Sequence, residues 1–260
     1  RVNVVDVSAF EVVENFIARR VNGIVLAPLD ARALVAPAEM AVRAGIPVVI
    51  IDSGLNSNLP VSTVSTDNYK GGALGARRLA ALLEGKGKVI LLRVLAGSTS
   101  TEQREAGFLD TIEKEFPEIE VISSDQHAGA TRDTAYRASQ NLLNRFGREV
   151  TGIFCPNESS ATGMLLALRD AGLAGGKVKF VGFDTGTQTL AALKAGDLQG
   201  LVVQNPFKMG YLGVKTVVAK LQGRPVMQDI DTGCELVTLE NLNESDTIDL
   251  ITPPLDKYLN

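Results

Sequence analysis

The sequence predicts an α/β protein in which strands and helices alternate along the whole chain. Apolar runs of strand length, such as 46–52 and 179–184, each end on a polar residue, and segments with helical spacing separate them. This alternation is typical of parallel sheets joined by right-handed crossovers. The strand–helix units also form a loose duplication on either side of about Ser65, which suits two similar lobes.

Each expected strand is a short apolar run bounded by Gly, Pro or polar residues. Gly45, for example, ends one helix, and Pro47 opens the strand that runs to Asp52. The expected strands are 2–7, 23–27, 47–52, 61–65, 88–94, 119–123, 151–155, 178–183 and 199–204. A weak extended region follows from Val226.

The expected helices carry apolar residues at helical spacing and begin at residues suited to capping. Helical spacing covers 11–20, 34–43, 134–145, 188–195 and 209–222. Further helices are capped by Asp67 or Asn68, by Ser100 with Gln103 in a capping-box spacing, and by Asn157. The C-terminal segment 240–260 is polar and is interrupted by Pro253-Pro254.

Composition places the chain among ordinary soluble globular proteins, and its length is enough for two domains of modest size. It has 260 residues, of which 45% are hydrophobic and 22% are charged, with a formal net charge of −4. The mild acidity argues against nucleic acid as a partner, because such proteins need a basic face. With one histidine and two cysteines the chain offers no metal cluster, and no cofactor is expected. Cys155 lies in an apolar run and is expected to be a buried filler.

The ends of the chain carry their own expectations. No apolar run approaches the ~20 residues of a membrane-spanning helix. The sequence starts at Arg1 rather than at Met and shows no signal peptide, so a processed, trimmed or incomplete chain is expected.

Several short segments, in order and spacing, carry a family resemblance over nearly the whole chain. The segments are 22–28, 44–52, 65–68 followed by Gly71-Gly72, 103–108, 157–158, 181–184, 203–206 and 253–255. Together they resemble the type I periplasmic sugar-binding proteins, the ribose-binding-like substrate receptors of ABC transporters.

The resemblance implies two doubly wound parallel-sheet lobes joined by a hinge of three crossing segments, near Thr66, Gln204 and Thr232. One lobe would be 1–66 plus 205–233, and the other 67–204 plus 234–260. The ligand would sit between lobes that close by a hinge motion. Relatives carry one more βα unit, of ~30 residues or more, ahead of the region matching Glu11. That first unit is expected to be absent here.

Two strand-end carboxylates are candidate ligand-binding residues by the same resemblance. Asp184 matches the position that receives sugar hydroxyls, and a carboxylate suits vicinal hydroxyls because it can accept two hydrogen bonds. The alternative for Asp184 is a helix N-cap. Asp52 follows the same logic at the end of its strand, and its alternative is a turn-forming residue before Ser53-Gly54.

Two further candidates are polar residues at helix or strand ends. Arg104 is expected in the first turn of a helix, where a cation opposes the macrodipole and needs an acceptor. The resemblance supplies a sugar oxygen, and the alternative is an ion pair with Glu102 or Glu105. Asn157 matches a ligand-contacting amide, and it can also cap a helix.

The remaining candidates are Gln204, Thr66 and Phe183. Gln204 lies at an expected crossing and offers a donor and an acceptor together. Thr66 lies at the first crossing. Ala130 stands where some relatives carry a stacking aromatic residue, which leaves Phe183 as the nearest aromatic candidate, although a core position for Phe183 also fits its apolar strand.

These features predict a non-enzymatic receptor that binds a sugar or related polyol and delivers it to the membrane permease of an ABC transporter. A monomer in the periplasm or another extracytoplasmic compartment is expected. The alternative is the effector-binding domain of a LacI-type repressor. An enzyme is the weakest hypothesis, because the chain has no Gly-x-Gly-x-x-Gly fingerprint, no Gly-x-Ser-x-Gly elbow and no metal set.

Overall fold

A computed structural model describes residues 6–253 and Leu255, with side chains from Ala9 onward. The chain divides into two compact units. The first unit contains Arg1–Asp67, Gly97–Ser100 and Asn205–Gly233, and the second contains Asn68–Ala96, Thr101–Gln204 and Cys234–Asn260. The chain therefore passes between the units beside Thr66, Gln204 and Thr232. The expected division had placed residues 97–100 in the second lobe.

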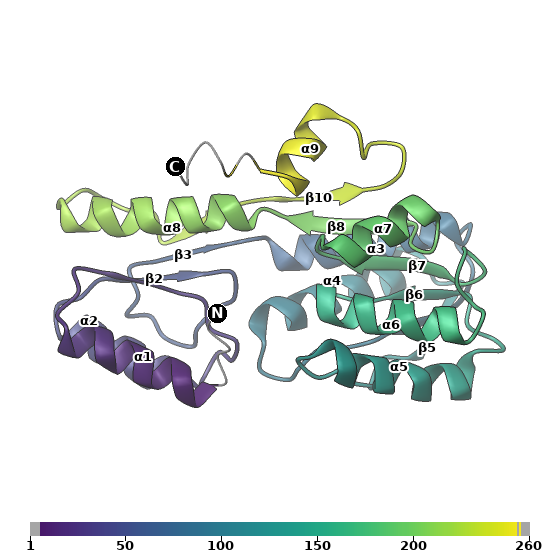
Figure 1. Cartoon of the computed structure of the whole chain (residues 1–260), viewed down its shortest axis with the longest axis horizontal. Helices are drawn as coiled ribbons and strands as arrows, with labels where there is room; N and C mark the ends of the chain where they lie inside the picture. The colour runs from purple at the N-terminus through teal and green to yellow at the C-terminus, as the bar shows by residue number, and fades with distance from the viewer. Residues whose placement is uncertain (1–5, 254, 256–260) are drawn as a thin grey trace. The chain divides into compact units, whose positions relative to one another are not determined.

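The first unit is a parallel sheet with helices on both faces (Figure 1). Its strands follow the order β1-β2-β3-β9, and each neighbouring pair is parallel. Its elements are α1 (Asp6–Ala18), β1 (Ile24–Leu26), α2 (Val35–Arg43), β2 (Val48–Ile51), β3 (Ser62–Ser65), α8 (Pro206–Leu221) and β9 (Asp229–Asp231).

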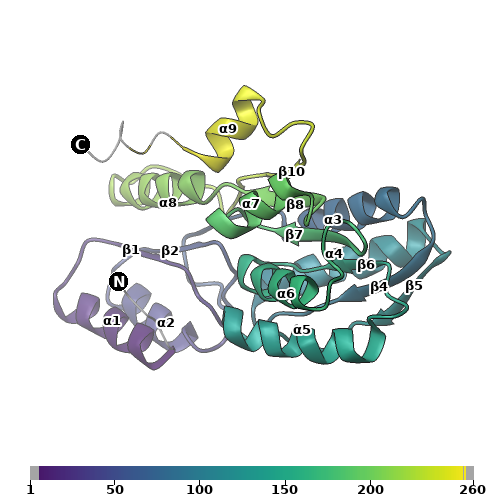
Figure 2. The same cartoon turned by 45° about the vertical axis from the view of Figure 1, so that its right-hand side comes forward.

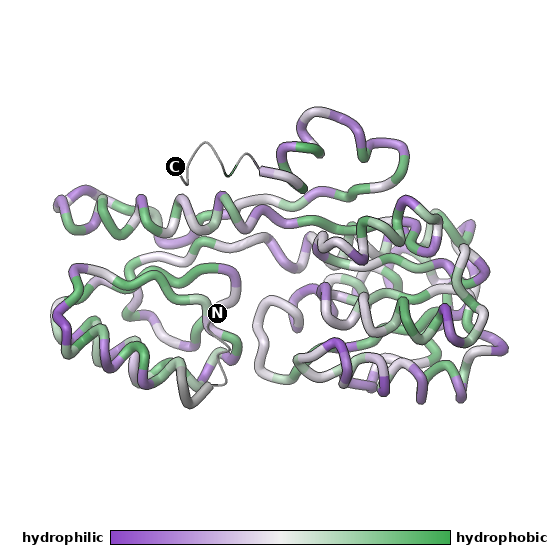
Figure 3. The backbone as a smooth tube through the Cα atoms, in the orientation of Figure 1, coloured by the Kyte–Doolittle hydropathy of each residue, from purple (hydrophilic) through white to green (hydrophobic). Residues whose placement is uncertain are grey.

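Alternation along β2 assigns the two faces of this sheet. Val48 and Ile50 belong to the core shared with α1 and α2, whereas Val49 and Ile51 pack with Val217 of α8. Successive side chains of a strand point to opposite faces, so a run that is apolar throughout needs cover on both. Figure 3 shows the resulting hydrophobic strands beside helices of mixed hydropathy.

The strand expected at 2–7 is wrong for the residues that the structure describes. Asp6 and Val7 lie in α1, and residues 1–5 fall outside the described range. The buried residues Ala9 and Val13 are one helical turn apart, so the apolar face of the expected helix extends back beyond Glu11.

The second unit is a six-stranded sheet in the order β10-β8-β7-β6-β4-β5, with only β10 antiparallel to its neighbour β8. The weak extended region after Val226 therefore supplies a strand to each sheet, β9 and β10. The elements are α3 (Asn68–Leu82), β4 (Gly87–Leu91), α4 (Thr99–Glu115), β5 (Ile119–Ser123), α5 (Arg132–Phe146), β6 (Gly152–Phe154), α6 (Glu158–Asp170), β7 (Lys179–Phe183), α7 (Thr187–Ala195), β8 (Gly200–Gln204), β10 (Cys234–Val237) and α9 (Ser245–Ile251).

Two hydrophobic cores cover the two faces of this second sheet. The helices α3 and α4 lie on one face, and α5 and α6 lie on the other (Figures 1 and 2). On the α3–α4 face, the rings of Phe108 and Phe154 stack with centroids 4.6 Å apart. On the other face, Cys155 is fully buried, which confirms the expected filler, and burial raises the pKa of its thiol. The alternation of strands and helices is thus confirmed. The polar C-terminal segment forms α9, a helix the sequence did not predict.

Candidate functional site

The ends of β7 and β8 bring two candidate residues into direct contact in the second unit. These strands are parallel neighbours, with Phe183 aligned to Val202. Asp184 follows β7 and Gln204 ends β8, so both stand at the carboxyl edge of the sheet. The Nε2 of Gln204 donates a hydrogen bond to Oδ1 of Asp184 at 2.7 Å. Parallel strands end together at this edge, which is where ligands bind in open α/β sheets.

Asp184 has an unusual backbone conformation. Its φ is 67°, in the left-handed region, although it is not a glycine. The N-cap of α7 is Gly186, so the N-cap interpretation of Asp184 is wrong. The side chain of Asp184 is 23% exposed, whereas that of Arg104 is 3% exposed. Asp184 is thus the solvent-facing end of this group of residues.

The guanidinium of Arg104 lies over the ring of Phe183, with its central carbon 3.8 Å from the ring centroid. Phe183 itself has no exposed surface and belongs to the core on the α3–α4 face. The core position considered for Phe183 is therefore the one found, and its ring supports Arg104 instead of offering a face to solvent. A cation over a desolvated aromatic face is held by ~2 kcal/mol.

The Arg104 guanidinium donates hydrogen bonds to three residues from different parts of the second unit. Its Nε donates to Oδ1 of Asn68 at 2.9 Å, its Nη1 to the carbonyl of Pro156 at 3.0 Å, and its Nη2 to Oε1 of Gln204 at 3.0 Å. Its Nη1 is also 3.9 Å from Oδ2 of Asp184. The buried cation is therefore compensated by a set of oxygens, as a buried charge requires.

Glycines in α3 and α4 allow these contacts by letting the two helices meet at backbone distance. A Cβ on Gly72 would collide with the carbonyl oxygen of Arg104, and a Cβ on Gly107 would collide with that of Tyr69. The close crossing fixes the start of α3 against the turn of α4 that carries Arg104.

Glu105, considered as an ion-pair partner of Arg104, is bound by the segment that follows β4. Its Oε1 accepts from the N–H of Val94 and its Oε2 from Nη1 of Arg93, each at 3.0 Å. Burial raises the pKa of Glu105, opposed by the Val94 N–H, by Arg93 and by His127. This carboxyl holds α4 onto the end of β4.

Asn157 caps α6, as one of its two interpretations required. Its Oδ1 accepts from the N–H of Ser160 at 3.0 Å. The next residue, Glu158, has its pKa raised by burial and then by the charge of Asp184. An open polar depression of about 410 Å³ begins here. It is lined by Arg132, Glu158, Ser159, Thr162, Thr187 and Gln188.

The first unit holds the other two candidates, Asp52 and Thr66. Asp52 follows β2 with a φ of 68°, and its N–H donates to the carbonyl of Val64 at 3.0 Å. Thr66 is buried, and its hydroxyl is 3.5 Å from the carbonyl of Gly233. For Asp52, the alternative role as a turn-forming residue therefore remains open.

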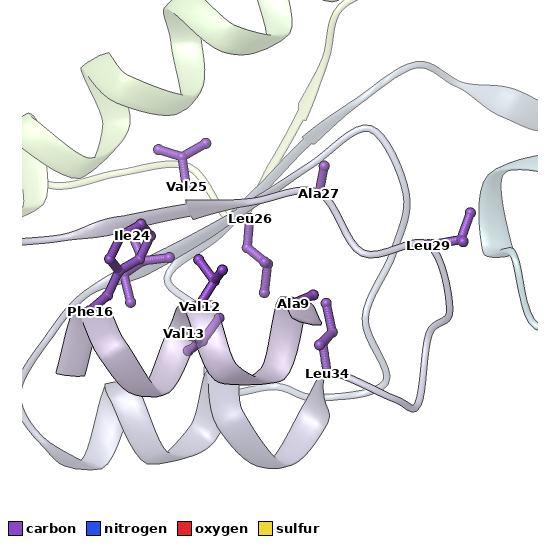
Figure 4. A pocket seen from close by; sticks show the side chains of 10 residues that line it. All are labelled: Ala9, Val12, Val13, Phe16, Ile24, Val25, Leu26, Ala27, Leu29 and Leu34. Atoms are coloured by element: carbon purple, nitrogen blue, oxygen red, sulfur yellow. The ribbon is translucent and has the colours of Figure 1, made fainter. Parts of the chain in front are cut away.

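A separate apolar pocket lies between α1 and β1 in the first unit (Figure 4). Its volume is about 210 Å³, and its lining is Ala9, Val12, Val13, Phe16, Ile24, Val25, Leu26, Ala27, Leu29 and Leu34. None of these side chains offers a hydrogen-bonding group, so the pocket does not suit a ligand rich in hydroxyls.

Asn68 is the residue that the sequence did not place in this site. The helical pattern marked it only as a possible cap, and its partner Arg104 lies 36 residues further along the chain. Within residues 6–253 and Leu255, no cluster of three His, Cys, Asp or Glu side chains could hold a metal ion. The helices in that same range are also too short or too polar to span a membrane.

Residues 8–225 match the family model described as periplasmic binding protein domain. The chain is 28% identical over 231 residues to a xylitol-binding protein of Mycolicibacterium smegmatis, covering 89% of this chain and 65% of that protein. It is 30% identical over 226 residues to a ribose import binding protein of Haemophilus influenzae, covering 87% of this chain and 75% of the relative.

Solved structures agree in fold. A carbohydrate transporter solute binding protein from Agrobacterium radiobacter, in complex with D-arabinose, aligns with a TM-score of 0.88 at 34% identity, over 93% of this chain and 82% of the other. An ABC transporter solute binding protein from Agrobacterium vitis with bound D-fucose aligns with a TM-score of 0.88 at 32% identity, over 94% and 84%. The chain therefore belongs to the periplasmic binding protein family.

Proposed function

We propose that this protein is a non-enzymatic receptor that binds a sugar or a related polyol and delivers it to an ABC transporter. The observation that carries the proposal is the hydrogen-bonded set Arg104–Gln204–Asp184 at the carboxyl edge of β7 and β8. The relatives are named for xylitol and ribose, and the structural neighbours hold D-arabinose and D-fucose.

The chemistry of this set suits hydroxyl groups. Asp184 supplies a partly exposed carboxylate, a strong acceptor for neighbouring hydroxyl donors. Gln204 offers both a donor and an acceptor, and Arg104 offers donors in a fixed plane. Polar groups that are already held in place cost less ordering on binding, which favours tight recognition of a small solute.

The proposed function also covers the two lobes, the remaining ligand residues and the place where the protein works. The two units are proposed as the two lobes, with Asp52 and Thr66 as ligand residues of the first and Asn157 as a ligand residue of the second. A monomer outside the cytoplasm, working with a membrane permease, fits the import role named for the ribose-binding relative.

Thermal unfolding in the presence of solutes tests the proposal. D-ribose, D-arabinose, D-allose, D-fucose, xylitol and myo-inositol should be compared with no ligand. A solute present at a thousand times its Kd stabilises the native state by about 4 kcal/mol, so the Tm of the protein should rise by several degrees for at least one of them.

The variants D184N and D170N sharpen this test. Asp184→Asn keeps the size of the side chain and tolerates the left-handed backbone, but it loses the charged acceptor, so the solute-induced shift should disappear. Asp170 accepts a hydrogen bond from Tyr136 at the far end of α6, so D170N should keep the shift. A panel without any shift in the wild type would count against the receptor function, and a full shift in D184N would remove Asp184 from the site.

A further inference from the structure

Asn68 lies at the point where the chain enters the second unit. Asn68 is the first residue of that unit after the break following Asp67, and Gln204 is the last before the break at Asn205. The guanidinium of Arg104 donates to both residues. One buried cation therefore joins two of the positions where the chain passes between the units.

The hydrogen bonds form a directional chain from a buried residue to a partly exposed one. Arginine has only donors, so the side-chain oxygens of Asn68 and Gln204 must both face Arg104. The amide nitrogen of Gln204 then points away from the guanidinium and donates to Asp184. The order of the chain is Asn68, Arg104, Gln204, Asp184, and its outer end is the partly exposed carboxylate.

Asn68 accepts from Nε, the guanidinium nitrogen nearest to the aliphatic part of the side chain. The Nε–H lies in the rigid guanidinium plane, so an acceptor held at Nε restricts rotation of that plane. Phe183 contacts the same guanidinium through its ring, with Cζ 3.8 Å from the ring centroid. Asn68 is 3% exposed, and it is held at the start of α3 by the close crossing with α4 at Gly72.

We propose that Asn68 is a positioning residue: it fixes the guanidinium of Arg104, and through Gln204 it fixes the orientation in which Asp184 meets a solute. Asn68 needs no contact with the solute itself. The binding part of this inference rests on the proposed receptor function, whereas its geometric part concerns only Asn68 and Arg104.

The geometric part is tested without any solute, by NMR of the full chain labelled with nitrogen-15 arginine. The Arg104 Nε–H signal is identified by its loss in R104K. In N68L, which keeps the branching at Cγ but has no acceptor, that proton should exchange with water at least about tenfold faster, as expected for a lost hydrogen bond to a charged group. In N68D, which keeps an acceptor oxygen, exchange should stay slow. Unchanged exchange in N68L overturns the proposal.

The binding part uses D-ribose and D-arabinose as probes in calorimetric titrations. N68L should weaken binding at least about tenfold, and N68D should restore it to within about threefold of the wild type. The matched control is N241L: Asn241 also bonds through both ends of its amide, to Thr238 and Leu236, beyond the start of β8. It should lower the Tm without changing Kd.

The outcomes separate the two proposals. If the wild type binds neither probe, nor any other solute of the panel, the receptor function fails, and the exchange experiment still decides the role of Asn68. If the wild type binds and N68L binds equally well, the positioning role fails while the receptor function stands. Loss of binding in N68L, with rescue in N68D and none of that loss in N241L, supports both.

Discussion

Asp52 and Asp184 share one backbone conformation in two different sheets. Each follows a parallel strand directly, with φ values of 68° and 67°, and each donates its N–H to the next strand, to Val64 and to Val202 respectively. A left-handed conformation at a residue other than glycine costs of order 1 kcal/mol. Glycine would adopt this positive φ without strain, yet both positions carry aspartate. This fits a role in which the carboxylate is needed at each strand end.

Replacing Asp184 with glycine should therefore separate stability from binding. Asp184→Gly removes the backbone strain, which offsets the lost hydrogen bond to Gln204, so the Tm should stay within a few degrees of the wild type. Solute affinity should nevertheless be lost together with the carboxylate. Differential scanning calorimetry with and without D-arabinose measures both quantities on one sample.

Glu84 provides the control for this experiment. It also has a positive φ, 53°, but it lies just beyond the end of α3 and outside the candidate site. Glu84→Gly should raise the Tm slightly and leave affinity unchanged. If D184G kept full affinity, the strain at Asp184 would need an explanation other than solute binding.

Arg104 should not be replaceable by lysine. A lysine cannot lie as a plane over Phe183, and it cannot meet Asn68, Pro156 and Gln204 in the same fork geometry. Each buried acceptor left without a donor costs about 1–3 kcal/mol, so R104K should lower the Tm by several degrees and reduce affinity more than tenfold.

Arg77 is the matched arginine for this comparison. It binds Glu115 through two nitrogens, at 2.9 and 2.6 Å, but both side chains are largely exposed. Exposed ion pairs contribute little to stability because water and salt screen them, so R77K should change the Tm little and the affinity not at all. Urea unfolding and calorimetric titration of both variants check this, and equal effects of R104K and R77K would contradict a special role for Arg104.

Much of this structure could be predicted because the sequence marks where each strand ends, by a polar residue after an apolar run. Apolar runs that stop on Asp184 and Gln204 place both side chains at one edge of a parallel sheet, since parallel strands end together. Their contact also depends on β7 and β8 being neighbours in the sheet, a strand order that was not predicted. The register that aligns Phe183 with Val202 was not predicted.

Asn68 and the left-handed aspartates could not be found in this way. The contact between Asn68 and Arg104 depends on two helices meeting at Gly72, and residue spacing alone does not reveal which helices cross. The conformation of Asp184 likewise depends on the neighbouring strand that receives its N–H. Periodicity reports which face of an element is buried, but not the partner that buries it.

Glu158 should make the stability of the second unit depend on pH. Partial burial of its carboxyl group and the charge of Asp184 raise its pKa in the folded protein, although the residue as a whole is exposed. The folded state therefore binds the proton more tightly than the unfolded chain, and stability falls as the pH rises from the ordinary glutamic acid pKa of about 4.3 through the raised value. E158Q lacks this penalty and should be the more stable protein at pH 7, with a difference that shrinks towards pH 4.

The exposed Glu113 on α4 is the control for this pH series. E113Q removes one carboxylate from a different helix, so its difference in Tm from the wild type should stay nearly constant from pH 4 to pH 7. The measurement is the Tm of the three proteins at half-unit pH steps, without solute. A gap between E158Q and the wild type that is as large at pH 4 as at pH 7 would show that the protonation of Glu158 does not govern the pH dependence.

Two helical glycines should respond to alanine in opposite directions. A Cβ on Gly72 would meet the backbone carbonyl of Arg104, so α3 and α4 must separate, at a cost of about 1–3 kcal/mol. Gly210 in α8 has open space around the same position, and alanine there should stabilise the helix by about 0.5–1 kcal/mol.

Calorimetric unfolding and solute titration of G72A and G210A distinguish these effects. G72A should lower the Tm and weaken solute binding together, because the displaced carbonyl belongs to Arg104 and the crossing also holds Asn68 against its guanidinium. G210A should raise the Tm and leave the affinity unchanged. Normal affinity in a folded but destabilised G72A would mean that Arg104 keeps its geometry without the close crossing, and the site would then depend on Phe183 and Gln204 for its order.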